Sequence, residues 1–193
     1  MRRRVFIAIN LPEKIKKELI NYQSKWKELP CRWIKKENLH LTLVFLNYLR
    51  DEELLKVLKT LREISQRHRS FSINLNKICY GPLKKMPPRM VWIVGKENQE
   101  LTNLQKDLEN SLFLSSIKNL SKSETRIYFP HITLGRIRQW EFRRIDPEER
   151  PEEKEIEEEI SLSFEVNSIE IMESQLKRGG AEYTILESYE FSR

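Results

Sequence analysis

The sequence has 193 residues, of which 33% are charged and 39% hydrophobic, proportions that are typical of a soluble globular protein. This length predicts one domain or two small lobes with a substantial core. The net charge is +6, but residues 148–159 carry −6 from eight Glu and two basic residues, so the other residues carry +12. A basic body of this kind favours polyanionic partners such as RNA.

Several classes of protein are excluded by simple patterns. Cys31 and Cys79 have neither metal-type nor CxxC spacing, so we expect reduced, buried thiols. The apolar run at residues 5–9 is too short for a signal peptide or a membrane span, which predicts a cytoplasmic protein without membrane association. A Gly-rich phosphate loop, a nucleophile elbow and a metal-ligand cluster are all missing, so no metal or cofactor is expected.

Strands and helices alternate along the chain. Helices are expected after Pro12, Asp51 and Asn98, with Asp51 and Asn98 as N-caps. Strands are expected at residues 5–9, 32–35, 39–46, 71–75, 89–94, 127–137, 162–166, 169–171 and 183–186. Loops are expected around Lys84 and Lys85, at residues 118–125 and at Gly179-Gly180, and the acidic stretch 148–159 is interpreted as a solvated insertion or a short exposed helix. This order predicts an α+β fold in two similar halves.

A repeated tetrapeptide is the strongest functional signal. His40-Leu41-Thr42-Leu43 recurs as His131-Ile132-Thr133-Leu134, and the two copies use two of the three histidines in the chain. On a strand, alternate side chains share a face, so each motif presents an imidazole and a hydroxyl together while its apolar residues hold the core. Two such strands facing one cleft would form a paired-imidazole site.

Paired imidazoles suit phosphodiester cleavage. An imidazole titrates near ~6.5, so one His can accept a proton while the other donates one. Thr42 and Thr133 can hydrogen-bond to phosphate oxygens, and Arg136 adds a forked cation. Strict alternation from His131 places Arg136 on the opposite face, so it reaches the cleft only if Gly135 introduces a bulge or the strand ends there.

The remaining candidates are interpreted more simply. His68 lies at an expected helix end and is interpreted as a surface residue. Trp33, Trp92 and Phe45 are expected in the core rather than at a ligand. Phe6 alternates with the core residues of its strand and faces either a second core layer or the cleft.

With both motifs located, the sequence resembles the 2H phosphoesterase superfamily, specifically the RNA 2′,3′-cyclic phosphodiesterases, also called 2′-5′ RNA ligases. Residues 4–12, 37–46, 129–136 and 174–183 carry the resemblance. The sequence departs from the family at Asn47-Tyr48, where a Gly is usual, and in the acidic stretch, which looks like an elaboration.

This resemblance implies a single domain over residues 1–193, with an α+β, bilobal fold. Two pseudo-symmetric lobes would place antiparallel sheets on either side of a central cleft, with helices on the outside. The resemblance also implies that no metal or nucleotide cofactor is needed and that the partner is RNA with 2′,3′-cyclic phosphate ends. We expect the protein to be a monomer.

The family's site residues transfer by position. His40 would protonate the departing 3′ oxygen and His131 would activate water, although these two roles could be reversed. Thr42 and Thr133 would hold the phosphate, and the ring would open to leave a 2′-phosphate. Arg136 would contact phosphate or base, and Phe6 would stack on the base.

Three alternatives stay open at the level of sequence. The same residues could join RNA ends through a 2′-5′ linkage, by microscopic reversibility. A non-catalytic module that binds 2′-5′ oligonucleotides or cyclic-phosphate ends would retain its ligand unchanged. A structural or adaptor protein would leave the paired motif unexplained.

Overall fold

The computed structural model describes residues 2–82, 87–115, 129–146, 148, 156–178 and 180–192. Its strands are β1 (Arg2–Asn10), β2 (Cys31–Trp33), β3 (His40–Arg50), β4 (Phe71–Gly81), β5 (Met90–Gly95), β6 (His131–Ile137), β7 (Glu158–Val166), β8 (Ser168–Lys177) and β9 (Gly180–Glu190). Its helices are α1 (Glu13–Gln23), α2 (Asp51–Ser65), α3 (Gln99–Leu114) and α4 (Gln139–Phe142), with 3-10 turns at Ser24–Trp26 and Lys36–Asn38. The α+β class is confirmed. Among the described residues, no helix combines the length and apolarity needed to cross a membrane.

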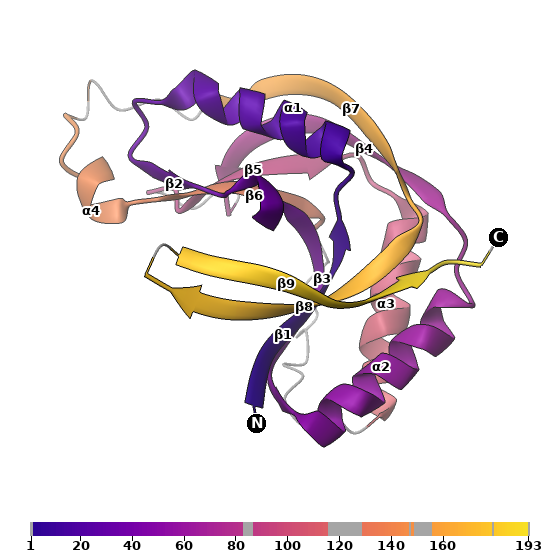
Figure 1. The fold of residues 1–193 in the computed structure, drawn as a ribbon. Helices are drawn as coiled ribbons and strands as arrows, with labels where there is room; N and C mark the ends of the chain where they lie inside the picture. Colours follow the sequence, from indigo (N-terminus) through magenta and orange to yellow (C-terminus); the bar gives the residue numbers. More distant parts are fainter. Residues whose placement is uncertain are drawn as a thin grey trace.

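The described strands form a nine-stranded sheet in the order β7-β4-β5-β6-β3-β1-β8-β9, with β2 added at β6. The paired strands are antiparallel throughout. Two halves, β7-β4-β5-β6 and β3-β1-β8-β9, meet where β3 pairs with β6 through Leu41 and Ile132. Each half therefore carries one His–Thr motif on its inner strand, in agreement with the predicted bilobal arrangement (Figure 1).

The helices link the two halves. Helix α1 follows β1 but lies against the other half, where Gln23 Nε2 donates to the Leu134 carbonyl of β6 at 3.0 Å. Lys25, just beyond α1, forms an ion pair with Glu158 of β7. Helices α2 and α3 pack against each other and contact β3 (Figure 1). Because α1 crosses from one half to the other, the halves are interlocked by their helices as well as by the sheet.

Local sequence explains where the helices begin. The Asn98 side chain accepts a hydrogen bond from the Leu101 amide at 2.7 Å, which confirms Asn98 as the N-cap of α3. The prediction that Asp51 caps α2 is wrong, because Asp51 is the first residue of the helix itself. The Glu53 carboxylate closes this helix end by accepting from the Arg50 amide at 2.9 Å. Acidic residues in a first turn also suit the positive end of the helix dipole.

Strand β1 separates the core from the cleft. Val5, Ile7 and Ile9 belong to the main core, whereas Phe6 and Ala8 on the opposite face form a small separate cluster around Met172. This is the alternation that a strand with two different faces produces.

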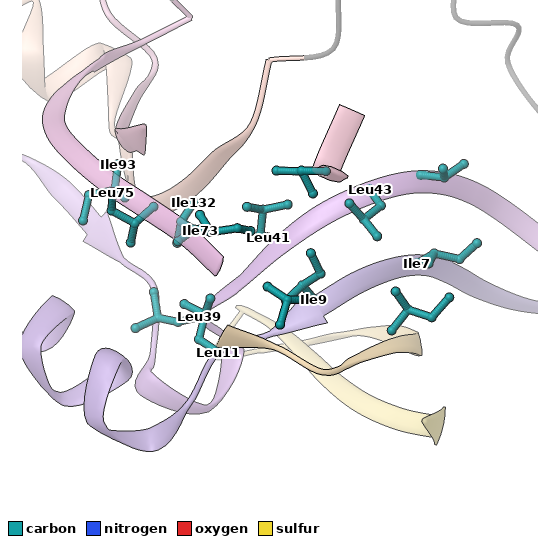
Figure 2. Close-up of a cluster of buried hydrophobic side chains, with 14 of the residues drawn as sticks. Ile7, Ile9, Leu11, Leu39, Leu41, Leu43, Ile73, Leu75, Ile93 and Ile132 are labelled. Atoms are coloured by element: carbon teal, nitrogen blue, oxygen red, sulfur yellow. The ribbon is translucent and has the colours of Figure 1, made fainter. Parts of the chain in front are cut away.

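The main core continues across the junction between the halves (Figure 2). Leu41 and Ile132, which pair at the junction, are 1% and 0% exposed. Core residues around this pair come from both halves: Ile7, Ile9, Leu43, Ile73, Leu75 and Ile93. Burying a side chain of this size contributes about 1.5–3 kcal/mol, so the core holds both motif strands firmly in place.

A bulge interrupts β3 at the last residue of its motif. Thr42 pairs with Ala8, but the next pair joins Val44 to Ile7, so Leu43 is an extra residue. Both Leu43 and Val44 point into the core as a result.

The same irregularity occurs in β6. Thr133 pairs with Trp92, but the next pair joins Gly135 to Val91, so Leu134 is the extra residue. The two motif strands therefore have a bulge at the same position of the tetrapeptide, Leu43 in β3 and Leu134 in β6. This shared irregularity supports pseudo-symmetry more strongly than the sequence alone.

Asn47 explains one departure from the family pattern. Its φ is 57°, in the left-handed region, beside a second irregularity of the β1–β3 pairing. Asn tolerates this conformation better than most residues, so it can occupy a position where a Gly is usual.

The structure corrects the interpretation of two segments. Strand β6 begins at His131 rather than near residue 127, and residues 127–128 lie outside the described residues. The end of the acidic stretch is not a solvated insertion, because Glu158 begins β7 and Glu157 pairs with Lys77 at 2.7 Å. Residues 84–85, 118–125, 149–155 and 179, for which loops or the acidic insertion were predicted, also lie outside the described residues.

Candidate active site

A cavity of about 420 Å³ lies where the two halves of the sheet meet. All six residues predicted for the site line it: His40, Thr42, His131, Thr133, Arg136 and Phe6. Leu41 and Ile132 are paired in antiparallel strands, so His40 lies next to Thr133 across the pair and Thr42 lies next to His131. Two imidazoles and two hydroxyls are thus brought to one cavity by residues from both halves.

The His40 ring is fixed by two hydrogen bonds and two ring contacts. Its Nδ1 lies 2.7 Å from the Asn38 carbonyl, and its Nε2 lies 3.0 Å from Thr42 Oγ1. A carbonyl can only accept, so Nδ1 carries a proton and the neutral ring offers Nε2 as an acceptor. The ring also packs against Phe6, at 4.9 Å between centroids, and against Tyr183 in a T-shaped contact at 5.1 Å. This environment fixes both the tautomer and the orientation of the imidazole.

Burial lowers the pKa of His40 from 6.5 to about 4. The hydrogen bond to the Asn38 carbonyl acts in the opposite direction, while the charges of Lys16, His131 and Arg136 lower the pKa further. His40 is therefore neutral at pH 7 in the free protein. An anion bound in the cavity would offset these cations and raise the pKa again.

His131 has a closely similar setting in the other half. Its Nδ1 donates to the Phe129 carbonyl at 2.9 Å, two residues back along the chain, just as His40 uses Asn38. Its ring stacks on Trp92, with 3.9 Å between centroids and an interplanar angle of 26°. Burial lowers the pKa of His131 below 6.5, against the effect of the Phe129 hydrogen bond. Both histidines thus have Nδ1 engaged by a backbone carbonyl, and Nε2 of His40 is in addition in contact with Thr42 Oγ1.

Arg136 reaches the cavity because of the bulge in β6. With Leu134 as the extra residue, alternation resumes one position later and Arg136 lies on the cleft side. Gly135 is required here, since a Cβ at this position would lie 2.3 Å from Cys31 Sγ and 2.8 Å from Trp33 Cε3. The sequence required either a bulge at Gly135 or the end of the strand, and the bulge lies one residue earlier, at Leu134, with the same effect on Arg136.

Phe6 and Phe45 both line the cavity but differ in exposure. Phe6 lines the cavity but is only 3% exposed, with His40, Phe45 and Tyr183 packed around its ring. Little of the Phe6 ring is exposed to the cavity, and the ring packs against the imidazole of His40. Phe45 was expected in the core, but it is 60% exposed and lines the cavity, so that prediction is wrong.

Three residues near the histidines were missed as functional residues. Trp92 is buried as expected, yet it forms the wall under His131. Asn38 binds the β8–β9 hairpin through its side chain, donating to the Ala181 carbonyl at 2.8 Å and accepting from the Tyr183 amide at 3.2 Å. Two signals in the sequence pointed to these residues. Asn38 lies two residues before His40, and Tyr183 lies in a segment that resembles the family.

The cavity is electropositive. Arg4, Arg32 and Arg136 line it and are exposed, while none of the lining residues among those described is Asp or Glu. Such a site favours anionic ligands. Within the described ranges, no three His, Cys, Asp or Glu side chains are grouped closely enough to hold a metal ion.

The geometry can support proton transfer around a phosphate. Two imidazoles present Nε2 atoms to one cavity, hydroxyls stand beside them, and guanidinium groups surround the space. These groups can accept a proton, donate a proton and stabilise negative charge on non-bridging oxygens.

Comparisons with known proteins identify the family of this chain. The family described as LigT like Phosphoesterase matches residues 9–92, which contain the first motif. An RNA 2′,3′-cyclic phosphodiesterase of Methanocaldococcus jannaschii is 29% identical, across 96% of this chain and 99% of the relative. A protein of the same name from Thermotoga maritima is 31% identical, across 70% of both chains.

Solved structures show the same fold. A protein of Thermus thermophilus superposes with a TM-score of 0.81 at 24% identity, covering 97% of each chain. Escherichia coli LigT superposes with a TM-score of 0.78 at 24% identity, covering 100% of this chain and 99% of LigT. The chain belongs to the LigT-like phosphoesterase family of the 2H superfamily, a family of enzymes.

Proposed function

We propose that this enzyme hydrolyses RNA 2′,3′-cyclic phosphate termini to 2′-phosphate ends, using His40 and His131 and no metal. The observation that carries the proposal is the meeting of two His–Thr motifs in one cationic cavity. The names of the Methanocaldococcus jannaschii and Thermotoga maritima relatives support the choice of substrate. Escherichia coli LigT, which has the same fold, has been crystallised with 3′-AMP.

In the proposed reaction, a water molecule attacks the phosphorus atom and the bond to the 3′ oxygen breaks. His131 Nε2 takes a proton from the water, and His40, protonated at Nε2, gives a proton to the departing 3′ oxygen. The products are a 2′-phosphomonoester and a 3′-hydroxyl group. Each of these proton transfers typically contributes about 10²–10⁴-fold to the rate.

The two histidines must hold one proton between them on their Nε2 atoms when the reaction begins. Both are neutral at pH 7 in the free protein, because burial lowers the pKa of each ring. The anionic cyclic phosphate stabilises a protonated imidazole and so raises the pKa values of both rings, which allows one of them to hold the required proton. Because the two rings are held so similarly, the reversed roles would use the same atoms.

The negative charge that builds on the phosphate oxygens during the reaction must be stabilised by hydrogen-bond donors. Thr42 and Thr133 share the cleft face with the histidines, and their hydroxyls can donate to the two non-bridging oxygens. Arg136 adds a forked cation on the β6 side.

We also infer that residues 1–193 act as a single domain, because one sheet and one core run through both halves.

The test is to incubate the enzyme, in EDTA, with a short RNA that ends in a 2′,3′-cyclic phosphate, and to identify the product by ³¹P NMR. A 2′-monophosphate end supports the proposal, and a 3′-monophosphate end contradicts the assignment of the leaving oxygen. RNA that binds but stays cyclic would identify a binding module instead. If added RNA with a 5′-hydroxyl becomes joined through a 2′-5′ linkage, ligation is also supported.

A further inference from the structure

The two walls of the cavity differ at one pair of equivalent positions. Both motif strands bulge after Thr, so the residue three positions after each Thr returns to the cavity. In β3 this residue is Phe45, and in β6 it is Arg136. A pseudo-symmetric site thus offers an aromatic ring on one wall and a guanidinium group on the other.

A nucleotide shows the same asymmetry, with an aromatic base at one end and phosphate at the other. Phe45 pairs with Phe6, and Thr42 pairs with Ala8, two residues along β1. This separation along a strand is about 6–7 Å, which is suited to the distance between a phosphate and its base across one ribose. The exposed face of Phe45 is therefore placed to stack on the terminal base when Thr42 binds the cyclic phosphate.

Arg4 lies one step farther along the same wall. It precedes Phe6 by two residues, so it shares the cleft face of β1 and lines the cavity. Its neighbour Arg3 forms an ion pair with Glu173 at 3.3 Å, whereas the described residues include no acidic partner for Arg4. Arg4 is thus an exposed guanidinium group directed at the space beyond the base platform.

We propose that this wall binds the terminal nucleoside with its base on Phe45 and the phosphate on its 5′ side at Arg4. The enzyme would then discriminate in favour of a cyclic phosphate that ends a chain, over the same group on a free nucleoside. This inference rests on the proposed function and deepens it, since it names the part of the RNA that is recognised beyond the reacting phosphate.

The experiment compares adenosine 2′,3′-cyclic phosphate with the same compound carrying a 5′-phosphate. For the unchanged enzyme, the 5′-phosphate should raise kcat/KM roughly ten-fold or more, as expected for a charge-assisted contact. In Arg4→Gln this ratio should fall close to one. A ratio near one in the unchanged enzyme, or a ratio that Arg4→Gln leaves intact, would overturn the proposal.

Arg2→Gln is the matched control, because Arg2 is exposed on the same strand but does not line the cavity. It removes the same charge and should keep the ratio, whereas an equal fall in Arg2→Gln would show a general charge effect and contradict a site at Arg4. Phe45→Leu keeps an apolar side chain and should raise KM roughly ten-fold for both substrates. An unchanged KM in Phe45→Leu would overturn the base platform.

The outcome also separates this inference from the proposed function. If the unchanged enzyme opens neither cyclic phosphate, nor the same group on an RNA, the proposed function itself is wrong. If it opens both compounds at equal rates, the function stands and the Arg4 site is wrong.

Discussion

Leu41 of β3 pairs with Ile132 of β6, and this buried pair joins the two halves of the sheet. Each of the two residues stands between the His and the Thr of its motif. The packing that fixes the pair on the core side therefore fixes both functional faces on the cleft side. The distance between the two imidazoles is set by core packing rather than by loops.

Replacing Ile132 by Ala should affect stability and activity together. The lost volume should cost about 2–5 kcal/mol of unfolding free energy, and the relaxed junction should lower kcat/KM at least about ten-fold. Leu104→Ala is the control, since Leu104 is equally buried but lies on α3. Denaturant unfolding and initial rates would be measured for both variants. Full activity in a destabilised Ile132→Ala would refute the link between core and site.

The pH dependence of kcat/KM should show a maximum on the acid side of 6.5. The proposed reaction needs one ring protonated and the other neutral, and this state is most populated between the two pKa values of the free enzyme. Burial lowers the pKa of His40 to about 4 and holds the pKa of His131 below 6.5. The rate constant should therefore rise as pH increases through about 4 and fall as pH increases through the lowered pKa of His131.

The profile of kcat alone should lie at higher pH, because the bound anion raises both pKa values. Initial rates between pH 3.5 and 9 at low and saturating substrate would give both profiles. A kcat/KM maximum above pH 7 would contradict the lowered pKa values of the two histidines in the free enzyme.

Gly135→Ala should impair phosphate binding. A Cβ at this position would collide with Cys31 and Trp33, so β6 must shift and carry Arg136 away from the cavity. Gly95→Ala is a matched control, since its Cβ would lie 2.7 Å from the Asn74 carbonyl oxygen, away from the cavity. Both variants should lose about 1–3 kcal/mol of stability, but KM should rise only for Gly135→Ala. Equal KM values in the two variants would contradict this role of the bulge.

Asn38→Ala should lower activity through the β8–β9 hairpin. The change leaves the Ala181 carbonyl and the Tyr183 amide without their partner, at a cost of about 1–3 kcal/mol. The Tyr183 ring would then no longer hold His40, and kcat should fall about ten-fold. Asn98→Ala removes a helix cap with a similar loss of stability and should keep kcat. If the two variants have the same kcat, Asn38 does not position His40.

The repeated motif made the centre of the site predictable from sequence. Alternation on a strand places His40 with Thr42 and His131 with Thr133, and the structure brings both pairs to one cavity. Composition and the order of elements were enough to predict an α+β fold in two halves, because each half follows ordinary periodicity.

The bulges could not be predicted from periodicity. Each bulge inserts one residue and so reverses which side chains face the cleft. The bulges bring Phe45 and Arg136 to the cavity, where strict alternation from the histidines would not place them. The contacts of Asn38 with Ala181 and Tyr183 join distant segments, so no local pattern reveals them. Trp92 reads as a core residue because it is one, and its contact with His131 depends on strand order.

The most direct test of the central claim is a double-mutant cycle on the two histidines. The rates of His40→Ala, His131→Ala and the double variant would be measured on an RNA ending in a 2′,3′-cyclic phosphate, in EDTA. If the imidazoles act in one concerted proton transfer, each single variant should lose about 10²–10⁴-fold, and the double variant should lose little more than the worse of the two. Single variants that keep rates within about ten-fold of the unchanged enzyme would contradict the two-histidine account.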